Sequence, residues 1–368
     1  MRILEVAPFA SPIDERREQL GGAQVLIADI ARGLASRGHA VTLAAANGSQ
    51  VEGAALADLD IDSARMRRAD LGPTDAPRTD DIAQREAFAR VREWLEAHTA
   101  EIDVAHAHAY DAPAFAALSR APRPVVHTLH LPPLDAGVVE AARAAKGATL
   151  STVSEANARA WRKAGVPVGH VIPNGVDLSR IPPGTDRGDH LIYAGRISPE
   201  KGVATAIDVA ARTGRGLVLV GGVYDERYFA KAVAPRVRRV ERLDRTVRGA
   251  VYLGARPREE VYRLMGSAAV TLMPVEWDEP FGLVAVESLA AGTPVVAYRR
   301  GGLVEIIDDI CGELVEPGDV EGLARAVGRA AGKDPAECRR RAQRFGVEAM
   351  ISAYEAMLAA LAHGERRS

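Results

Sequence analysis

The sequence has few of the residues on which secreted, metal-bound or membrane-spanning proteins depend. Only two cysteines occur in 368 residues, Cys311 and Cys338, and their spacing matches no metal-binding pattern. A disulfide framework is therefore excluded, and the expected compartment is the reducing cytoplasm. No run of about eighteen apolar residues is present, which argues against a membrane-spanning helix. The opening residues, 1–6, predict a buried strand and lack the apolar stretch of a signal peptide.

An excess of charge and the common nucleotide-binding signatures are also missing. The formal net charge is −2, so no global field draws the chain to nucleic acid. Neither G-x-G-x-x-G nor G-x-x-x-x-G-K-[ST] occurs. The first absence argues against an NAD-dependent oxidoreductase. Lysine is scarce too, with five among the 47 basic residues. Each lysine is therefore a candidate for a specific role, because arginine would serve at most surface positions.

What the sequence does contain is a regular alternation of strands and helices. Hydrophobic residues make up 47% and charged residues 26%, as in ordinary globular proteins. Two series of apolar strands alternating with amphipathic helices predict an α/β protein with two doubly wound domains. We expect these domains at 1–172 and 190–346, joined by a Pro-, Gly- and Asp-rich linker at 173–189. The C-terminal stretch, 347–368, is predicted to form a helix that packs back on the first domain.

A helix is predicted in the second half of the chain, where the sequence is most informative. Pro280 suits the first helical position, and Gly292 suits a left-handed cap, so the helix is expected over Phe281–Ala291. Its first turn would present unpaired N–H groups and the positive end of the helix dipole. This part of the chain therefore favours the binding of a phosphate.

Two glutamates flank that helix start. Glu279 precedes the helix, and Glu287 lies roughly 12 Å further along its axis. Hydrogen-bond acceptors on both sides of an anion site suit a phosphorylated sugar, whose hydroxyls need acceptors. The alternative is a well-capped core helix with two solvated glutamates.

A glycine-bounded loop with two cations follows an expected strand that ends at Ala194. Gly195 and Gly202 permit sharp turns, and Arg196 and Lys201 carry the charge. Strand ends in doubly wound sheets open toward the ligand. A diphosphate leaving group would need such cations, because negative charge grows on it as the bond breaks. A charged surface loop is the alternative.

Histidines gather at two neighbouring strand ends, in the sequences H-A-H and H-T-L-H. They are His106, His108, His127 and His130. Alternate residues of a strand share a face, so two of these rings point the same way. Three interpretations stay open: a metal site, polar side chains that donate hydrogen bonds to a substrate, and packing. The second is favoured over a metal, which needs three or four converging ligands.

Two further segments each allow two interpretations. Gly21 and Gly22 open a helix after the first strand and its loop, which fits either a tight helix start or contact with a ligand. A helix is also expected over 224–242, and the basic run extends to 248. Its arginines favour a solvated face, and peripheral contact with an anionic membrane is the alternative. They are Arg236, Arg238, Arg239, Arg242, Arg245 and Arg248.

Taken together, four motifs resemble those of one family. In chain order they are G-G-A at 21–23, V-I-P-N-G-V-D at 171–177, A-G-R-I-S-P-E-K-G at 194–202 and E-P-F-G-L-V-A-V-E at 279–287. Their order and spacing resemble the retaining glycosyltransferases of sequence family 4, over nearly the whole chain. The resemblance implies the GT-B architecture, in which two Rossmann-like domains are present and the second holds most of the nucleotide sugar.

The resemblance also implies roles for individual residues. Arg196 and Lys201 would bind the donor diphosphate as catalytic cations. Glu279 would accept hydrogen bonds from the transferred sugar, and Glu287 would hold the ribose hydroxyls. His130 would occupy the sugar-contacting position of the first domain, with His108 nearby. The remaining donor contacts that it implies are Gly21, Gly22, Phe281, Gly282 and Leu283.

The function that the resemblance implies is transfer of a hexose-type unit with retention of configuration. The donor is expected to be a UDP-sugar and the acceptor a hydroxyl of unknown class. The reaction would need neither a metal nor another cofactor. A nucleotide-sugar epimerase of similar fold and a non-catalytic nucleotide-sugar-binding partner remain alternatives.

Overall fold

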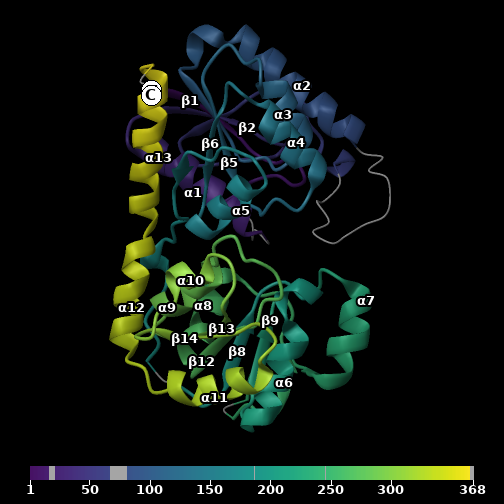
Figure 1. Ribbon diagram of the computed structural model, residues 1–368, viewed down its shortest axis with the longest axis vertical. Coiled ribbons are helices and arrows are strands. Elements are labelled where there is room, and N and C mark those ends of the chain that lie inside the picture. Colours follow the sequence, from purple (N-terminus) through teal and green to yellow (C-terminus); the bar gives the residue numbers. More distant parts are fainter. Residues whose placement is uncertain (16–20, 67–80, 186, 245, 365–368) are drawn as a thin grey trace. The chain divides into compact units, whose positions relative to one another are not determined.

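A computed structural model describes residues 1–15, 21–66, 81–185, 187–244 and 246–364 (Figure 1). The chain divides into two compact units. The first comprises Met1–Pro173 with Glu348–Ser368, and the second comprises Asn174–Val347. Apart from Pro173, the stretch expected as a linker, 173–189, is grouped with the second unit.

The first unit is built on a parallel sheet whose strand order is β3-β2-β1-β4-β5-β6-β7. Successive strands run outward from β1 on one side and from β4 on the other, so the order reverses between β1 and β4. In such sheets ligands bind beside the carboxyl ends of the strands at this reversal. The strands are β1 Arg2–Val6, β2 Ala40–Ala44, β3 Ala54–Leu56, β4 Val104–Ala107, β5 Val125–Leu129, β6 Thr149–Thr152 and β7 His170–Val171.

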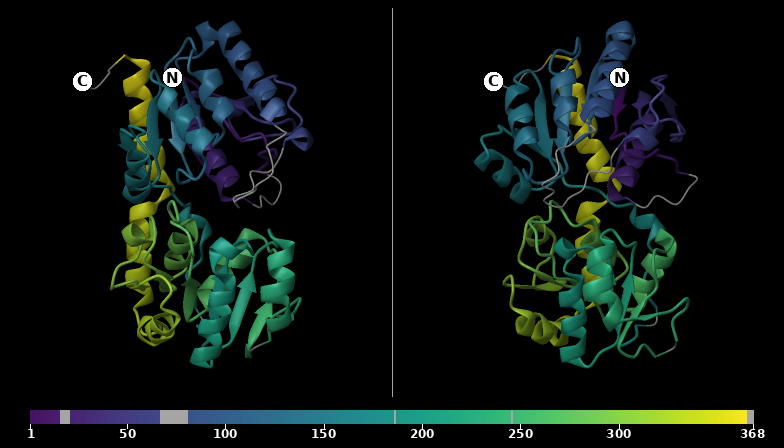
Figure 2. Two further views of the ribbon diagram at one scale, coloured as in Figure 1. Left: turned by 45° about the vertical axis from the view of Figure 1, so that its right-hand side comes forward. Right: turned by 90° about the vertical axis from the view of Figure 1, so that its right-hand side faces the viewer.

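Helices cover both faces of this sheet (Figure 2). Successive residues of a strand face opposite layers. Leu4 and Ala105 pack in the core beneath α2, whereas the His106 ring lies 4.8 Å from the Tyr354 ring of α13. The C-terminal helix therefore packs on the first unit as predicted (Figure 1). The helices are α1 Gly22–Ser36, α2 Asp81–Ala97, α3 Ala112–Leu118, α4 Ala136–Ala144, α5 Glu155–Lys163 and α13 Val347–Ala362.

The second unit contains another parallel sheet, in the order β10-β11-β9-β8-β12-β13-β14. Its order reverses between β8 and β12. The central strands are fully buried and apolar apart from Thr271, as expected of a sheet covered on both faces. The strands are β8 Leu191–Ala194, β9 Leu217–Val220, β10 Arg238–Arg239, β11 Ala250–Tyr252, β12 Val270–Met273, β13 Val295–Tyr298 and β14 Gly312–Val315.

Helices of the second unit follow most of its strands. Glycines flank the first of them, and an aspartate caps α11 by accepting from a backbone N–H two residues into the helix. The helices are α6 Val203–Thr213, α7 Glu226–Tyr228, α8 Arg258–Ser267, α9 Leu283–Ala290, α10 Leu303–Ile306, α11 Val320–Ala330 and α12 Pro335–Ala342. Among helices of the described residues, none combines the length and apolar character that crossing a bilayer requires.

The prediction of one arginine-rich helix over 224–242 is wrong. After the three residues of α7, the chain forms a π-turn at Phe229–Val233 and a 3₁₀ turn at Ala234–Arg236, and then β10 begins. The regular helix already ends at Tyr228, and Pro235 prevents it from resuming, because proline has no backbone N–H to donate within a helix. Arg245 lies outside the described residues, and no continuous basic helix face exists in the rest of this segment.

Candidate functional site

The second unit gathers three of the predicted residues beside the reversal of its strand order. The loop that holds Arg196 and Lys201 follows β8, and the loop that holds Glu279 follows β12. Because β8 and β12 are parallel neighbours, the two loops leave the sheet from the same edge. The fold thereby brings together residues that are 78 positions apart.

Lys201 and Glu279 form a well-defined ion pair. The Lys201 Nζ lies 2.6 Å from Glu279 Oε2, and the two side chains are 17% and 13% exposed. Trp277 holds both partners. Its indole N–H donates to the same carboxylate oxygen at 2.8 Å, and its ring lies 4.6 Å from Lys201 Nζ. Sequence reasoning missed Trp277, although it is one of three tryptophans and stands two residues before Glu279.

Arg196 lies on the same loop as Lys201 but is held by different partners. Its guanidinium carbon lies 4.7 Å from the centre of the Tyr224 ring, and Nη2 is 3.6 Å from Glu200 Oε1. The hydroxyl of Tyr193 donates to the Arg196 carbonyl at 2.8 Å. Burial raises the pKa of Tyr193 well above its usual value, so this hydroxyl keeps its proton and remains a donor. The side chain of Arg196 is 31% exposed and can meet a ligand.

Helix α9 begins two residues later than predicted. It spans Leu283–Ala290, and Gly282 is its cap, with φ of +110°. Pro280 is therefore not at the first helical position. A residue with a Cβ would be strained at this φ and would also meet the Leu303 side chain. The predicted left-handed cap at Gly292 is confirmed, with φ of +90°.

The start of α9 is held firmly against the core. Phe281 is buried, and its ring meets the Phe345 ring edge-on with centroids 5.7 Å apart. Further along α9, the Ser288 hydroxyl donates to Thr271 Oγ1 of β12 at 2.7 Å. The first-turn N–H groups, which include that of Leu283, are thereby fixed in direction.

Glu287 lies inside the unit in an ion pair that sequence reasoning missed. It is buried, and its Oε1 accepts from the Arg258 guanidinium and, at 3.4 Å, from the Tyr262 hydroxyl. Burial alone would lower the pKa of Arg258. The neighbouring Glu287 carboxylate and Tyr262 together have the opposite effect and outweigh burial, so the pKa lies above its usual value. Both contacts engage Oε1, so within the described part of the chain Oε2 is the oxygen that remains for a ligand. Arg258 begins α8, and nothing in the sequence marks it as the partner of a residue 29 positions away.

A glycine pair after β13 supports the Glu279 loop. The Gly302 N–H donates to the Glu279 carbonyl at 2.7 Å. Gly301 has φ of +54°, and a Cβ there would lie 2.5 Å from the Glu279 nitrogen. The two backbones can approach this closely only because position 301 has no side chain.

We expect Gly301→Ala to destabilise the protein more than Gly249→Ala does. Both glycines have left-handed φ values, +54° and +62°, but nothing lies within 4 Å of a Cβ at Gly249. The control should cost about 1–2 kcal/mol from backbone strain. Gly301→Ala should cost about 1–3 kcal/mol more, because the Glu279 backbone must move. Urea denaturation of both variants measures the difference, and equal losses would contradict the close approach.

The other predicted site residues belong to the first unit. Gly21 caps α1 at an ordinary extended φ of −117°, and Gly22 is the first residue of the helix. The backbone geometry of Gly21 therefore does not require a glycine. His108 and His130 lie at the carboxyl ends of β4 and β5, and their rings stack with centroids 5.2 Å apart.

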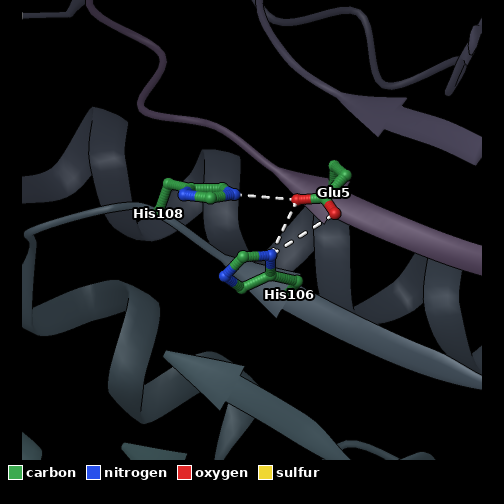
Figure 3. Close-up of side chains that lie close together, drawn as sticks. All are labelled: Glu5, His106 and His108. Atoms are coloured by element: carbon green, nitrogen blue, oxygen red, sulfur yellow. Dashed lines mark hydrogen bonds and ion pairs between the residues drawn. The ribbon is translucent and has the colours of Figure 1, made fainter. Parts of the chain in front are cut away.

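Glu5, which sequence reasoning missed, lies between two of the histidines (Figure 3). One carboxylate oxygen, Oε2, is 2.8 Å from His108 Nε2 and 3.1 Å from His106 Nδ1. Burial raises the pKa of Glu5, but the two histidines outweigh it and lower that pKa to about 2. By residue type these three could ligate a metal. Here the ring nitrogens are already hydrogen-bonded to the carboxylate. The only signal in the sequence was one acidic residue within the apolar strand R-I-L-E-V.

His127 is not part of that group. It is fully buried, and its ring stacks on Phe115 with centroids 4.4 Å apart. Neither ring nitrogen has a hydrogen-bond partner among the described residues. Burial therefore lowers the pKa of His127 to about 3. Its role is packing, one of the three interpretations considered for the histidines.

Solved structures define the class of fold. AviGT4, a glycosyltransferase involved in avilamycin A biosynthesis, superposes with a TM-score of 0.70 at 23% identity and covers 99% of both chains. HepE of Anabaena in complex with UDP-glucose superposes with a TM-score of 0.71 at 21% identity, over 98% of this chain and all of HepE. Two doubly wound units and these neighbours define the GT-B fold.

Sequence comparisons then give the family. The model of "Glycosyltransferase Family 4" matches residues 20–180, and that of "Glycosyl transferases group 1" matches residues 185–346. The chain therefore belongs to the glycosyltransferases of the family 4 type, as the motifs indicated.

Curated relatives match over part of their length. The glycogen synthase of Mycobacterium tuberculosis is 37% identical over 185 residues, which is 47% of this chain and 42% of the relative. The D-inositol 3-phosphate glycosyltransferase of Acidothermus cellulolyticus is 34% identical over 181 residues, 43% of this chain and 39% of the relative. The chain thus spans about two fifths of the length of these relatives.

Proposed function

We propose that this protein is a retaining glycosyltransferase that moves a hexose-type sugar from a UDP-sugar to an acceptor hydroxyl. The observation that carries the proposal is the Lys201–Glu279 pair beside the start of α9, at the strand-order reversal of the second unit. A cation, a carboxylate and a helix N-terminus at one sheet edge suit a ligand that combines a diphosphate with a sugar.

The cations stabilise the leaving group. As the bond between the sugar C1 and the diphosphate oxygen breaks, its electron pair moves onto the diphosphate. Arg196 and Lys201 carry fixed positive charge on the β8 loop, and α9 adds the positive end of its dipole. Interactions that grow stronger as charge develops lower the barrier, by on the order of 3 kcal/mol for a single donor.

Glu279 orients the sugar. Both Lys201 and Trp277 engage its Oε2, which leaves Oε1 to accept from sugar hydroxyls. When a diphosphate binds, Lys201 lies between two anions, the diphosphate and the Glu279 carboxylate. The carboxylate thereby also fixes the direction of the ammonium group. Glu287, through its Oε2, is the proposed acceptor for the ribose hydroxyls.

The proposed route to retention is attack on the face that the diphosphate leaves. The acceptor oxygen forms a bond to C1, and its proton passes to an oxygen of the departing diphosphate. No covalent intermediate with the protein is needed. Two cations and a helix N-terminus already oppose the charge on the diphosphate, which supports transfer without a metal.

The nucleotide and the acceptor are proposed from the relatives. HepE has been crystallised with UDP and with UDP-glucose, and these names support a UDP-sugar donor here. A D-inositol 3-phosphate glycosyltransferase is among the relatives, so we include a small phosphorylated polyol among the acceptors to be screened.

Binding and product analysis test the proposal together. UDP, GDP, ADP and TDP are compared by thermal shift, and UDP should stabilise by about 2.7 kcal/mol at a hundredfold excess over its dissociation constant. UDP-glucose is then incubated with an acceptor panel in the presence of EDTA. The coupling constant of the anomeric proton in the product should match that of the donor.

Three outcomes would contradict the proposal. A product of inverted configuration would exclude retention, and complete loss of activity with EDTA would exclude metal-free transfer. Conversion of UDP-glucose to another nucleotide sugar without an acceptor would identify an epimerase.

A further inference from the structure

A buried chain of hydrogen bonds crosses the first unit and ends at His130. From His106 the chain extends one way to Thr128 at 2.8 Å and on to Ser151 at 2.7 Å. Glu5 joins His106 to His108, and His108 Nδ1 lies 3.0 Å from His130 Nε2. Its members other than His130 are buried. In such a place each contact must pair a donor with an acceptor.

Glu5 decides the direction of these bonds. A carboxylate with a pKa near 2 is ionised at neutral pH, and it then has only acceptor sites. His108 must therefore present a proton at Nε2, 2.8 Å from Glu5 Oε2. The same holds for Nδ1 of His106, whether or not that ring is charged. Thr128 and Ser151 adjust, because a hydroxyl can both donate and accept.

The direction passes from His108 to His130. Burial lowers the pKa of His108 to about 4, so the ring is neutral and carries one proton. With that proton at Nε2, its Nδ1 is a lone pair. His130 must then donate from Nε2 across the 3.0 Å contact. Burial also lowers the pKa of His130 well below its usual value, so His130 carries no second proton.

This leaves the other nitrogen of His130 as an acceptor. His130 is half-buried, and its Nδ1 makes no hydrogen bond to the part of the chain that the structure describes. A neutral ring with a bare Nδ1 accepts from an O–H group and repels the lone pairs of a carboxylate or phosphate.

We propose that Glu5 is a positioning residue that acts through His108 to fix His130 as a neutral hydrogen-bond acceptor for a carbohydrate hydroxyl. The identity of the ligand rests on the proposed function. The polarity of His130 does not, because it follows from contacts within the first unit. At this position the protein selects an uncharged hydroxyl-bearing group over an anionic one.

Nuclear magnetic resonance of the full chain labelled with ¹⁵N-histidine tests the polarity directly. Long-range proton–nitrogen correlations near neutral pH should show His108 and His130 each protonated at Nε2 and bare at Nδ1. A proton at Nδ1 of His130, or protons at both of its nitrogens, would overturn the proposal. The measurement needs no substrate, so a failure of the proposed function would leave this result intact and be recognised separately by the absence of UDP-glucose binding.

Two variants test the part played by Glu5. Glu5→Leu removes the acceptor of His108, and His108→Phe removes the acceptor of His130. Each should speed exchange of the His130 Nε2 proton with water at least about tenfold. His127→Phe is the matched control, because it replaces a buried histidine that is not part of the hydrogen-bond chain. It should leave the His130 signals unchanged. Unchanged exchange in a folded Glu5→Leu or His108→Phe protein would contradict the role of Glu5. If neither variant folds, the tautomer of the unmodified protein still decides.

Discussion

Replacing Lys201 by alanine should lower turnover at least about a hundredfold, because one fixed cation at the leaving group is lost. The effect should fall on turnover more than on binding. An interaction that strengthens as charge develops on the diphosphate contributes more to the transition state than to the ground state. Steady-state kinetics with UDP-glucose and calorimetric titration with UDP measure the two separately.

The loss would have two sources in the structure. Lys201 itself supplies charge, and it also holds Glu279, which shares its carboxylate oxygen with Trp277. Without the ammonium group, Glu279 keeps only the hydrogen bond from the Trp277 indole, so its side chain is less firmly oriented toward the sugar. Lys201→Arg would keep the positive charge but replace the compact ammonium group by a planar guanidinium. It should therefore retain only part of the activity that Lys201→Ala loses.

A second lysine of the same unit provides the control. Lys333 pairs with Glu313 at 3.2 Å, and these side chains are 13% and 19% exposed, close to the values for Lys201 and Glu279. Lys333→Ala removes a comparable ion pair whose carboxylate lies on β14, the last strand in the order of the sheet. It should lower stability to a similar degree and leave turnover within about twofold. Equal losses of turnover in the two alanine variants would show that Lys201 acts only through stability.

The sequence predicted this site because its residues lie in short motifs at strand ends. Arg196, Lys201 and Glu279 each follow a buried strand, and parallel strands deliver their carboxyl ends to one edge. The partners Trp277 and Tyr224 were not predicted. Whether an aromatic ring lies over a cation depends on loop geometry, and periodicity carries no information about it.

The sequence also could not predict which buried charged residues pair over long distances along the chain. Arg258 meets Glu287 across 29 residues, and Glu5 meets His108 across 103. Hydrophobic periodicity gives the face on which a residue lies but not the charged residue that it meets. Two local backbone features were missed as well: the expected arginine-rich helix ends at Tyr228, and Gly282, with a left-handed φ, delays the start of α9.

Buried histidines should make the protein lose stability as the pH falls from about 6.5 toward 4. The folded state holds His127 with a pKa near 3, whereas the unfolded chain protonates it near its usual value of 6.5. Between these values the unfolded state binds a proton that the folded state does not, so the free energy of unfolding falls with decreasing pH. One such group contributes about 1.4 kcal/mol per pH unit. His108, with a pKa near 4, acts in the same direction.

Replacing His127 by phenylalanine should make that dependence shallower. The variant keeps the stack on Phe115 and removes two ring nitrogens that have no hydrogen-bond partner among the described residues. At neutral pH the relief of those nitrogens and the bulk of the larger ring oppose each other, so the net change should stay within about 2 kcal/mol. Between pH 6 and 4 the variant should lose about 1.4 kcal/mol less per pH unit than the unmodified protein.

Urea denaturation at several pH values measures this slope, and His363→Phe is the control because His363 is exposed near the end of α13. That variant should retain the full pH dependence. An unchanged slope in His127→Phe would mean that His127 takes up a proton in the folded protein, through a partner or a movement that the structure does not show. A shallower slope in His127→Phe alone would assign part of the acid sensitivity to a histidine outside the Glu5 hydrogen-bond chain, and would separate packing from positioning among the four histidines that the sequence placed together.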